Sequence, residues 1–549
     1  MKSFNPQGRS KMLKPSVYLS VSFLVIFWCF SSLASLRVVQ ESQEGVELEL
    51  STQKPEIQPK RIGGKSYSQV VVADMKNQLP EGYPEVPSSL ELIWIPQGKS
   101  PVLSYETLNY QTIPLPSELS YQSTTQNHCG ERKAIRKNLQ AYRKSFGTIP
   151  AKIEEIGYVA SDRLMRIRFW PIRYKAAQNQ LSFTPQIRIK IRFLEDKTGG
   201  KRPVTHAKNS IASYLVANKK SISLPKLLNS GNVDLIVSHP KYQNNLSRLL
   251  DFKRSLGREV REYYVENKTS REIREILQHE YSLPSPPSST LLVGNIDEIP
   301  AWKGSGDNRW TDFPYSTLDG DNLPDISLGR IPVHSPEELH AFIDKAISRE
   351  KDINPREEIL LTAGRDQSLG CPANVTKVGS KILKGAPEVT IIQKYKTKVS
   401  TEEVFSAYNQ NPSLVVYDGH GNRSGMTEIP LLISSLNKLT NSTYPLILDI
   451  ACLNANWGES ASPRNFAESI LFSEKRGAAG ILASGGSGYG HDFFQTLGEL
   501  VGEAQQVTPE DPKMNQIGQV ILAAKVKHGT QDRTYWNYYG DPSSSIWKF

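Results

Sequence analysis

Cysteine is scarce in this chain of 549 residues, which contains only Cys29, Cys129, Cys371 and Cys452. These are too few for a disulfide-dense scaffold. The sequence also lacks an HExxH motif, a Walker A loop and a CxxC pair, and the segment GGSGYG (485–490) fits neither GxSxG nor GxGxxG. These absences exclude the usual signatures of zinc peptidases, P-loop enzymes and dithiol oxidoreductases.

Acidic residues are sparse in the first part of the chain. Residues 1–226 contain 33 Lys and Arg against 17 Asp and Glu, a net charge of +16, whereas residues 227–549 contain 33 against 39, a net charge of −6. The overall charge of +10 therefore belongs to the first part alone. Its basic residues are scattered without an aromatic stacking platform, so no nucleic-acid partner is expected. The asymmetry indicates at least two units with different roles.

Only one stretch is apolar and long enough to reach across a membrane. Residues 15–36 carry no charge, follow a basic start and contain small residues at Ser32 and Ala34. This pattern is typical of a secretory signal peptide, residues 1–34, cleaved after Ala34. The alternative is an uncleaved membrane anchor, which would be the only membrane contact. In both cases we expect the rest of the chain to be secreted, at the cell surface or in the periplasm.

Residues 35–226 are predicted to form a β-rich domain and a basic linker. Apolar and polar residues alternate, as in half-buried strands, and turn-forming residues separate the runs. The predicted strands are 46–51, 66–75, 88–96, 162–174 and 186–195. The basic segment 131–144 fits either a helix or an exposed loop, and the basic segment 197–226 is interpreted as the linker.

From about residue 230, short apolar strands alternate with amphipathic helices. Such alternation predicts a parallel sheet flanked by helices, and continuous apolar runs such as LILDIA predict strands buried on both faces. The predicted strands are 232–239, 289–295, 358–364, 388–393, 413–421, 444–452 and 477–486. The predicted helices are 242–257, 270–282, 335–351, 376–385, 400–410 and 465–475. We expect an α/β unit in two halves, residues 227–352 and 353–549.

Two reactive residues lie at the ends of successive apolar strands. His420 lies at the end of the first of them (413–421), and Cys452 ends the second (444–452), 32 residues later. If these parallel strands are neighbours, both side chains emerge at the carboxyl edge of the sheet, where ligands bind. A thiolate beside an imidazole forms a nucleophile with its acid–base partner, and the backbone amides of Gly421 and Cys452 are placed to form an oxyanion hole. A buried core thiol and a structural turn histidine are the alternatives.

The same residues carry a resemblance to a known family. The chain resembles the gingipain family (peptidase family C25), a family of caspase-like cysteine peptidases. The similar segments follow one another in the same order and are VDLIVSH, DISLGRIPVHSPEEL, VVYDGHGN, LILDIACLNANW, FAESILFSEKRGAAGILAS and YWNYYGDPSSSIW. GYPEVP (82–87) and RLMRIRFWPIRY resemble the family's propeptide. The resemblance implies a gingipain-like catalytic domain behind an inhibitory β-rich prodomain. It also implies that Cys452 is the nucleophile, His420 the general acid or base, and Gly421 an oxyanion-hole residue.

The chain departs from the family pattern at several site positions. Asp366 is the nearest acid to the position that orients the catalytic histidine. The acidic residue that confers arginine preference would fall near Cys371 and Pro372, where the sequence has no carboxylate. Arginine preference is therefore not carried over. The resemblance places the wall of the substrate pocket at Tyr489, together with Ser484.

Three carboxylates, Asp319, Asp321 and Asp325, lie close together in the segment DGDNLPD. Carboxylates at short spacing around a glycine resemble part of a calcium loop, although the distal Glu of an EF-hand is missing. A solvated turn is the alternative, because Asp, Gly, Asn and Pro all favour turns. We expect no required cofactor, and calcium only as a structural ion at this loop.

Two further histidines stand beside candidate partners. Adjacent side chains cannot easily form an ion pair, so His128–Cys129 is interpreted as non-catalytic. His491–Asp492 follows the last predicted strand and is interpreted as a surface pair, with a place in the substrate pocket as the alternative.

Together these patterns predict a secreted cysteine endopeptidase made as a zymogen. Cys452 would form a thioester acyl-enzyme, and His420 would protonate the leaving amine. Protein or peptide substrates and the chain's own prodomain are the expected partners. A catalytically silent scaffold of the same fold and a transpeptidase with the same dyad are the alternatives.

Overall fold

The computed structural model describes most of residues 35–547. The predicted signal peptide (1–34) and the pair His128–Cys129 lie outside the described residues. The undescribed positions after residue 34 are 73–74, 78, 127–131, 144, 147–148, 197–210, 222–231, 305–309, 352–357, 366–369, 395–399, 430, 459, 461–462, 488–489, 507–511, 529–533 and 548–549. No helix in the described part of the chain has both the length and the apolar character needed to cross a bilayer.

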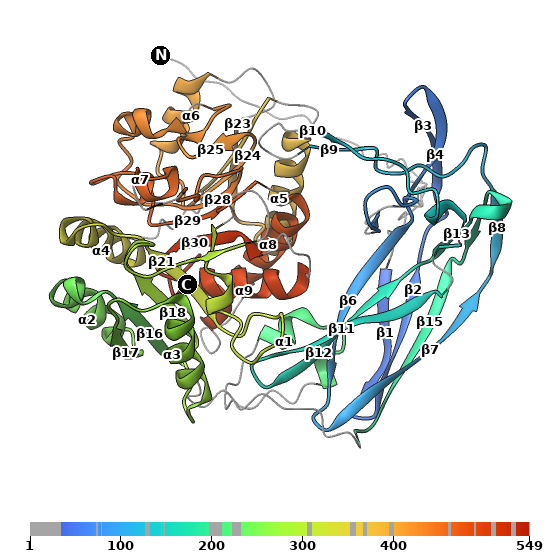
Figure 1. Ribbon diagram of the computed structural model, residues 1–549, viewed down its shortest axis with the longest axis horizontal. Helices are drawn as coiled ribbons and strands as arrows, with labels where there is room; N and C mark the ends of the chain where they lie inside the picture. The colour runs from blue at the N-terminus through green and yellow to red at the C-terminus, as the bar shows by residue number, and fades with distance from the viewer. Residues whose placement is uncertain are drawn as a thin grey trace, which may run out of the picture.

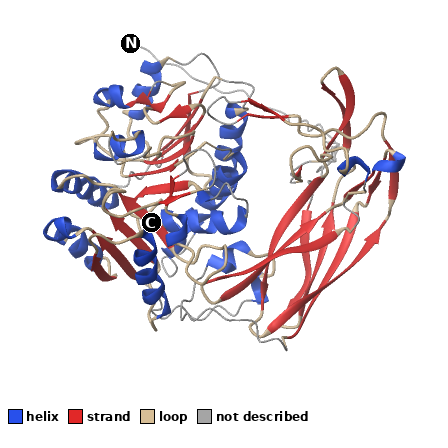
Figure 2. Ribbon diagram, viewed as in Figure 1, coloured by secondary structure: helices blue, strands red, loops and turns tan. Residues whose placement is uncertain are grey.

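The first domain is a β-sandwich (Figures 1 and 2). Two four-stranded antiparallel sheets, in the orders β1-β2-β15-β7 and β11-β12-β6-β5, share one apolar core. A three-stranded sheet, β13-β14-β8, and the hairpins β3–β4 and β9–β10 complete it. Its strands are β1 (Ser35–Ser42), β2 (Gly45–Ser51), β3 (Glu56–Ile62), β4 (Lys65–Val71), β5 (Lys76–Asn77), β6 (Pro87–Ile95), β7 (Lys99–Leu108), β8 (Gln111–Pro114), β9 (Thr124–Gln126), β10 (Arg132–Ala134), β11 (Ala151–Val159), β12 (Asp162–Phe169), β13 (Ile172–Lys175), β14 (Gln180–Phe183) and β15 (Gln186–Glu195).

The alternation of apolar residues explains these strands. In β15, Ile187, Ile189 and Ile191 are fully buried, whereas the residues between them are partly or fully exposed. The predicted strand 162–174 is divided into β12 and β13 around Pro171, which lacks the N–H that a continuous ladder needs. The basic segment 131–144 contains β10 and a short 3₁₀ turn, so it is not an α-helix.

The second domain is built on a ten-stranded sheet in the order β17-β16-β18-β21-β30-β29-β28-β24-β22-β23. Its strands are β16 (Val233–Ser238), β17 (Glu259–Tyr264), β18 (Ser289–Val293), β21 (Ser327–Ile331), β22 (Glu358–Ala363), β23 (Thr390–Lys394), β24 (Leu414–Asp418), β28 (Leu446–Ile450), β29 (Gly480–Ser484) and β30 (Trp536–Gly540). Short strands outside this sheet are β19 (Trp302–Lys303), β20 (Trp310–Thr311), β25 (Gly421–Asn422), β26 (Gly425–Met426) and β27 (Leu431–Leu432).

Helices cover both faces of the large sheet. Its central strands are buried on both sides, and successive residues such as Leu360 and Leu361 enter different apolar clusters. One cluster contains α2, α4, α6 and α7, and the other contains α5, α8 and α9. The helices are α1 (Ile211–Leu215), α2 (Ser247–Ser255), α3 (Ser270–Ser282), α4 (Pro336–Lys351), α5 (Cys371–Gly385), α6 (Thr401–Tyr408), α7 (Phe466–Phe472), α8 (His491–Glu503) and α9 (Ile517–His528).

Two α/β halves are present, and within each half the strands other than β30 are parallel. They meet at β30, which comes from the end of the chain, pairs antiparallel with β29 and bridges to β21 at Tyr539 and Arg330. The amino ends of both halves lie on the same side, because Lys253 bonds both Asp234, near the start of β16, and Asp541, which follows the partner of Gly480 at the start of β29. The parallel pairing of β22, β24, β28 and β29 places their carboxyl ends at one edge.

The β-sandwich packs on the α5–α8–α9 face of the second domain. Leu92, Val159 and Leu164 of the sandwich belong to the same apolar cluster as residues of these helices. Helix α1 lies inside the segment interpreted as a linker, yet it buries Ile211 and Leu215 in this cluster. The described part of that segment is therefore a packed helix, because its short apolar run finds a partner only in the folded chain.

Polar contacts supplement this apolar interface. The Arg166 guanidinium donates to the carbonyl of Val526 at 2.6 Å. The Tyr158 backbone N–H donates to Asp321 Oδ2, also at 2.6 Å. Figure 1 also shows the β9–β10 hairpin extending from the sandwich toward the second domain.

Candidate active site

His420 and Cys452 lie at the same edge of the large sheet. Strands β24 and β28 are parallel neighbours, as predicted, and their register pairs Asp418 with Ile450. His420 and Cys452 each follow their paired residue by two positions, so both leave the sheet at its carboxyl edge. The fold thus brings together two residues that are 32 positions apart in the sequence.

The loop after His420 lies directly against the loop that carries Cys452. A Cβ added at Gly421 would lie 2.7 Å from Ala451 Cβ, 2.9 Å from Asn454 Oδ1 and 3.0 Å from the carbonyl oxygen of Cys452. Real Cβ atoms do not approach that closely, so only glycine allows this contact. The absence of a side chain at Gly421 therefore sets the spacing between the two loops.

The backbone around Cys452 is held in an unusual conformation. Leu453, the next residue, has a φ of 62°, which a leucine rarely adopts. Its N–H donates to the carbonyl of Gly486 at 3.2 Å, and Ala455 N–H donates to the carbonyl of Ser484 at 3.0 Å. Such backbone strain persists only where the surroundings impose it, and it concentrates at functional sites. Cys452 itself is fully buried in the chain as described.

A carboxylate, Glu428, secures the loop that carries His420. Its two oxygens accept hydrogen bonds from the backbone N–H groups of His420, at 2.9 Å, and of Arg365, at 2.8 Å. The Tyr417 hydroxyl donates to the carbonyl of His420 at 2.8 Å. Nothing in the sequence pattern marks Glu428 as functional, apart from its place eight residues after His420. Asp366, predicted as the orienting acid, lies outside the described residues.

Of the two predicted pocket residues, the structure describes only Ser484. Tyr489 lies outside the described residues. Ser484 is buried at the end of β29, where its hydroxyl donates to the carbonyl of Gly486 at 2.6 Å and accepts from its N–H at 3.1 Å. Its role in a substrate pocket stays a prediction.

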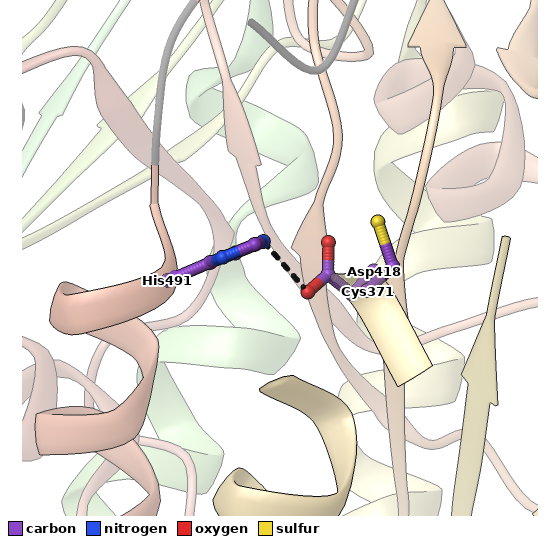
Figure 3. Close-up of side chains that lie close together, drawn as sticks. All are labelled: Cys371, Asp418 and His491. Atoms are coloured by element: carbon purple, nitrogen blue, oxygen red, sulfur yellow. Dashed lines mark ion pairs between the residues drawn. The ribbon is translucent and has the colours of Figure 1, made fainter. Parts of the chain in front are cut away.

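A second cluster of reactive side chains lies at the same edge (Figure 3). Cys371 begins α5, Asp418 ends β24 and His491 begins α8. Among the described residues, this is the one group of three or more Cys, His, Asp and Glu side chains whose ligand atoms all lie within 4.8 Å of one another. His491 Nε2 lies 3.0 Å from Asp418 Oδ2. The Asp492 side chain lies at the surface, as interpreted, whereas that of His491 is only partly exposed, because packing of α8 on the sheet turns its ring toward Asp418.

The cluster also brings a carboxylate close to Cys371. The sequence has no carboxylate beside Cys371 and Pro372, but the fold brings Asp418 there from another element. The Asp418 carboxylate is fully buried and accepts a hydrogen bond from Asn374 Nδ2 at 2.7 Å. A carboxylate contributed by the strand that leads to His420 thus lies close to Cys371.

The carboxylates of the loop Asp319, Asp321 and Asp325 are engaged by the protein itself. Asp325 Oδ2 accepts the N–H of Leu318 at 2.6 Å, and Asp321 accepts that of Tyr158 from the β-sandwich. Burial raises the pKa of Asp319 to about 6 and holds the pKa of Asp325 well above its ordinary range. The loop is not part of the group with close ligand atoms described above. Calcium binding at this loop stays a prediction.

Comparisons with known proteins point to one family. The chain matches the family model described as Peptidase family C25 over residues 229–547. It is 26% identical over 477 residues to a Lys-gingipain of Porphyromonas gingivalis W83, an alignment that covers 80% of this chain and 27% of that protein. It is 25% identical over 346 residues to gingipain R2 of the same species, covering 58% of this chain and 46% of that protein. The chain therefore spans about a quarter of the length of the Lys-gingipains and under half of gingipain R2.

Solved structures agree with the fold. The crystal structure of the Arg-specific cysteine proteinase gingipain R matches with a TM-score of 0.51 and 22% identity, over 58% of this chain and 79% of that chain. A complex of pro- and mature domains from Porphyromonas gingivalis matches with a TM-score of 0.51 and 22% identity, over 57% of this chain and 81% of that chain. At this identity the likeness shows a shared fold.

Proposed function

Because the chain belongs to peptidase family C25, we propose that it is an exported cysteine endopeptidase made as a zymogen. The observation that carries the proposal is the contact between the His420–Gly421 loop and the Ala451–Cys452 loop at the carboxyl edge of the sheet. A thiol and an imidazole held on two touching loops form the minimal apparatus for acyl transfer.

In the proposed reaction, Cys452 acts as the nucleophile. Its thiolate attacks the carbonyl carbon of the scissile peptide bond, and the backbone amides of Gly421 and Cys452 stabilise the oxyanion that forms. The C–N bond then breaks, and His420 gives its proton to the leaving amine. Water attacks the resulting thioester, His420 takes up the proton from that water, and the C–S bond breaks to regenerate the Cys452 thiolate.

The zymogen proposal is supported by the packing of the two domains. The β-sandwich shares an apolar cluster with α5 and α8, whose first residues, Cys371 and His491, lie at the edge that carries the proposed dyad. Cys452 is fully buried while the sandwich is in place. Export is supported by the sequence of residues 1–34, and peptide or protein chains are the proposed substrates.

The proposal can be tested by labelling with a peptidyl electrophile. We expect the reagent to modify Cys452 after limited proteolysis has released the β-sandwich, and to react far more slowly with the intact chain. Mass spectrometry locates the modified cysteine, and a peptide-library digest measures cleavage. Cys371→Ser is the matched control, since it removes the other described cysteine and should leave the label on Cys452.

Three outcomes would contradict the proposal or select an alternative. Cleavage by a Cys452→Ala variant at the rate of the unmodified chain would exclude the nucleophile. A chain that neither reacts nor cleaves after release of the sandwich would be the silent scaffold. Products that gain an added amine in preference to water would identify a transpeptidase.

A further inference from the structure

Cys371, Asp418 and His491 form a compact group to which the proposed acyl-transfer steps assign no role. They come from three separate elements, the start of α5, the end of β24 and the start of α8, and converge in Figure 3. Cys371 and Asp418 are fully buried, and the His491 side chain is 29% exposed. The group is thus closed on the protein side and open beside the histidine.

Their chemistry is that of a transition-metal site. Sulfur, imidazole nitrogen and carboxylate oxygen are the three protein ligand types of zinc. Two nitrogen or oxygen ligands around tetrahedral Zn²⁺ lie about 3.3 Å apart, given bond lengths near 2.0 Å. His491 Nε2 and Asp418 Oδ2 lie 3.0 Å apart, and all three ligand atoms lie within 4.8 Å of one another. Small side-chain rotations therefore suffice to surround an ion.

Neighbouring side chains hold the candidate ligands through hydrogen bonds. Asn374 Nδ2 donates to Asp418 Oδ2 at 2.7 Å, and Gln495 Nε2 donates to Asn374 Oδ1 at 2.7 Å. Cys371 is the first residue of α5, where the helix dipole favours a negative group such as a thiolate. Hydrogen bonds of this kind orient metal ligands and tune their affinity.

We propose that Cys371, Asp418 and His491 bind one divalent ion of the zinc class, with a fourth position open to water on the exposed side of His491. On binding, the Cys371 thiol releases its proton to solvent and no redox change occurs. Asp418 lies two residues before His420 on the same strand end. An ion held by Asp418 therefore lies next to the His420 loop, and we expect it to inhibit cleavage, an effect that rests on the proposed peptidase function.

Metal binding is measured first, without reference to activity. The probe is Co²⁺, added to the full chain carrying Cys452→Ala so that the dyad thiol cannot bind it. We expect one Co²⁺ per chain and a thiolate-to-cobalt charge-transfer band that Zn²⁺ displaces. Adding Cys371→Ser should abolish the band, and adding His491→Gln should weaken Co²⁺ binding at least tenfold.

The proposal is overturned if the Cys452→Ala chain binds no Co²⁺ with a thiolate band, or if the band survives Cys371→Ser. Thermal unfolding of the metal-free variants shows whether each one folds, and His491→Gln, at a partly exposed position, provides a second variant if Cys371→Ser does not.

Inhibition is then measured on the chain with an intact dyad. We expect Zn²⁺ to inhibit cleavage and His491→Gln to raise the inhibitory concentration at least tenfold. Equal inhibition of both proteins would overturn the inhibitory role. If no chain cleaves peptides, the peptidase proposal fails, whereas the Co²⁺ result still decides the metal site.

Discussion

The two halves of the large sheet surround a buried carboxylate with different partners. In the first half, Asp234 accepts hydrogen bonds from Lys253 at 2.9 Å and Arg258 at 2.6 Å, and Lys253 also reaches Asp541 at 2.8 Å. Burial alone would raise the pKa of Asp234, but the charges of Lys253 and Arg258 outweigh it and hold that pKa below its usual range. In the second half, the buried Asp418 lies beside an imidazole, an amide and a thiol.

The difference separates structural charge from reactive chemistry. A carboxylate surrounded by permanent cations is neutralised, and such clusters hold elements together. A carboxylate that shares its surroundings with a thiol and an imidazole can exchange protons or bind an ion. The two clusters lie at opposite edges of the sheet, because Asp234 is near the amino end of β16 and Asp418 is at the carboxyl end of β24.

The largest expected effect concerns the neutralised cluster. Asp234→Asn leaves Lys253 and Arg258 buried with too little negative charge, so we expect the free energy of unfolding to fall by about 3–5 kcal/mol. Denaturant unfolding measures this. Asp251→Asn is the control, because Asp251 is 77% exposed in its pair with Arg254, and its effect should stay within about 0.5 kcal/mol. Equal effects would mean that the buried cluster has no special structural role.

A second substitution tests the reactive edge. Gly421→Ala places a methyl group against Ala451 and Cys452, so the two loops must separate. We expect peptidase activity to fall about a hundredfold, since a displacement of about 1 Å at a catalytic centre has that effect. Gly379→Ala on α5 is the control. The three atoms nearest to its added Cβ all belong to the side chains of Leu361, at 2.5 Å, and Ile391, at 3.4 Å, and not to the backbone. If both variants lose stability and activity in parallel, Gly421 has only a packing role.

The pH dependence of stability should distinguish two kinds of buried carboxylate. Asp234 has a lowered pKa, so its stabilisation is complete at neutral pH and is lost as the pH falls below about 4. Asp319 has a pKa raised to about 6 by burial, so the folded state gains stability as the pH falls from about 6 toward 4. Urea unfolding measures the free energy of unfolding across this range. Asp319→Asn should remove its dependence on pH between about 6 and 4, and Asp234→Asn should remove its dependence on pH below about 4. The opposite slopes would contradict these assignments.

The smallest expected effect concerns docking of the β-sandwich. Lys76 pairs with Asp492 beside His491 and lies 3.5 Å from Gln495, but the Lys76 and Asp492 side chains are about 40% exposed. We expect Lys76→Ala to change docking by less than about 1 kcal/mol. The rate of electrophile labelling at Cys452 in the intact chain reports docking. Leu92→Ala, in the apolar cluster, should raise the labelling rate more than Lys76→Ala does. If Lys76→Ala has the larger effect and the rate depends strongly on salt, the sandwich docks mainly by charge.

Local patterns were sufficient for the two proposed catalytic residues and for most strands of the large sheet, although they did not predict β17, β21 and β30. Alternation marks β15, continuous apolar runs mark β24 and β28, and His420 and Cys452 are conspicuous because each follows such a run. Helix α5 is predicted to start at residue 376 but begins at Cys371, and α8 is not predicted at all. Because Cys371 and His491 are first residues of these helices, their meeting with Asp418 depends on how the helices pack on the sheet.

The sequence alone determined the β-rich and α/β domains, the family, and the placing of His420 and Cys452 at strand ends, because these depend on local periodicity and short motifs. Only the tertiary structure decided that β30 joins the two halves of the sheet, that α1 packs rather than links, that Glu428 secures the His420 loop, and that Cys371, Asp418 and His491 converge. Each of these depends on contacts between segments far apart in the chain, and no local pattern encodes such distances.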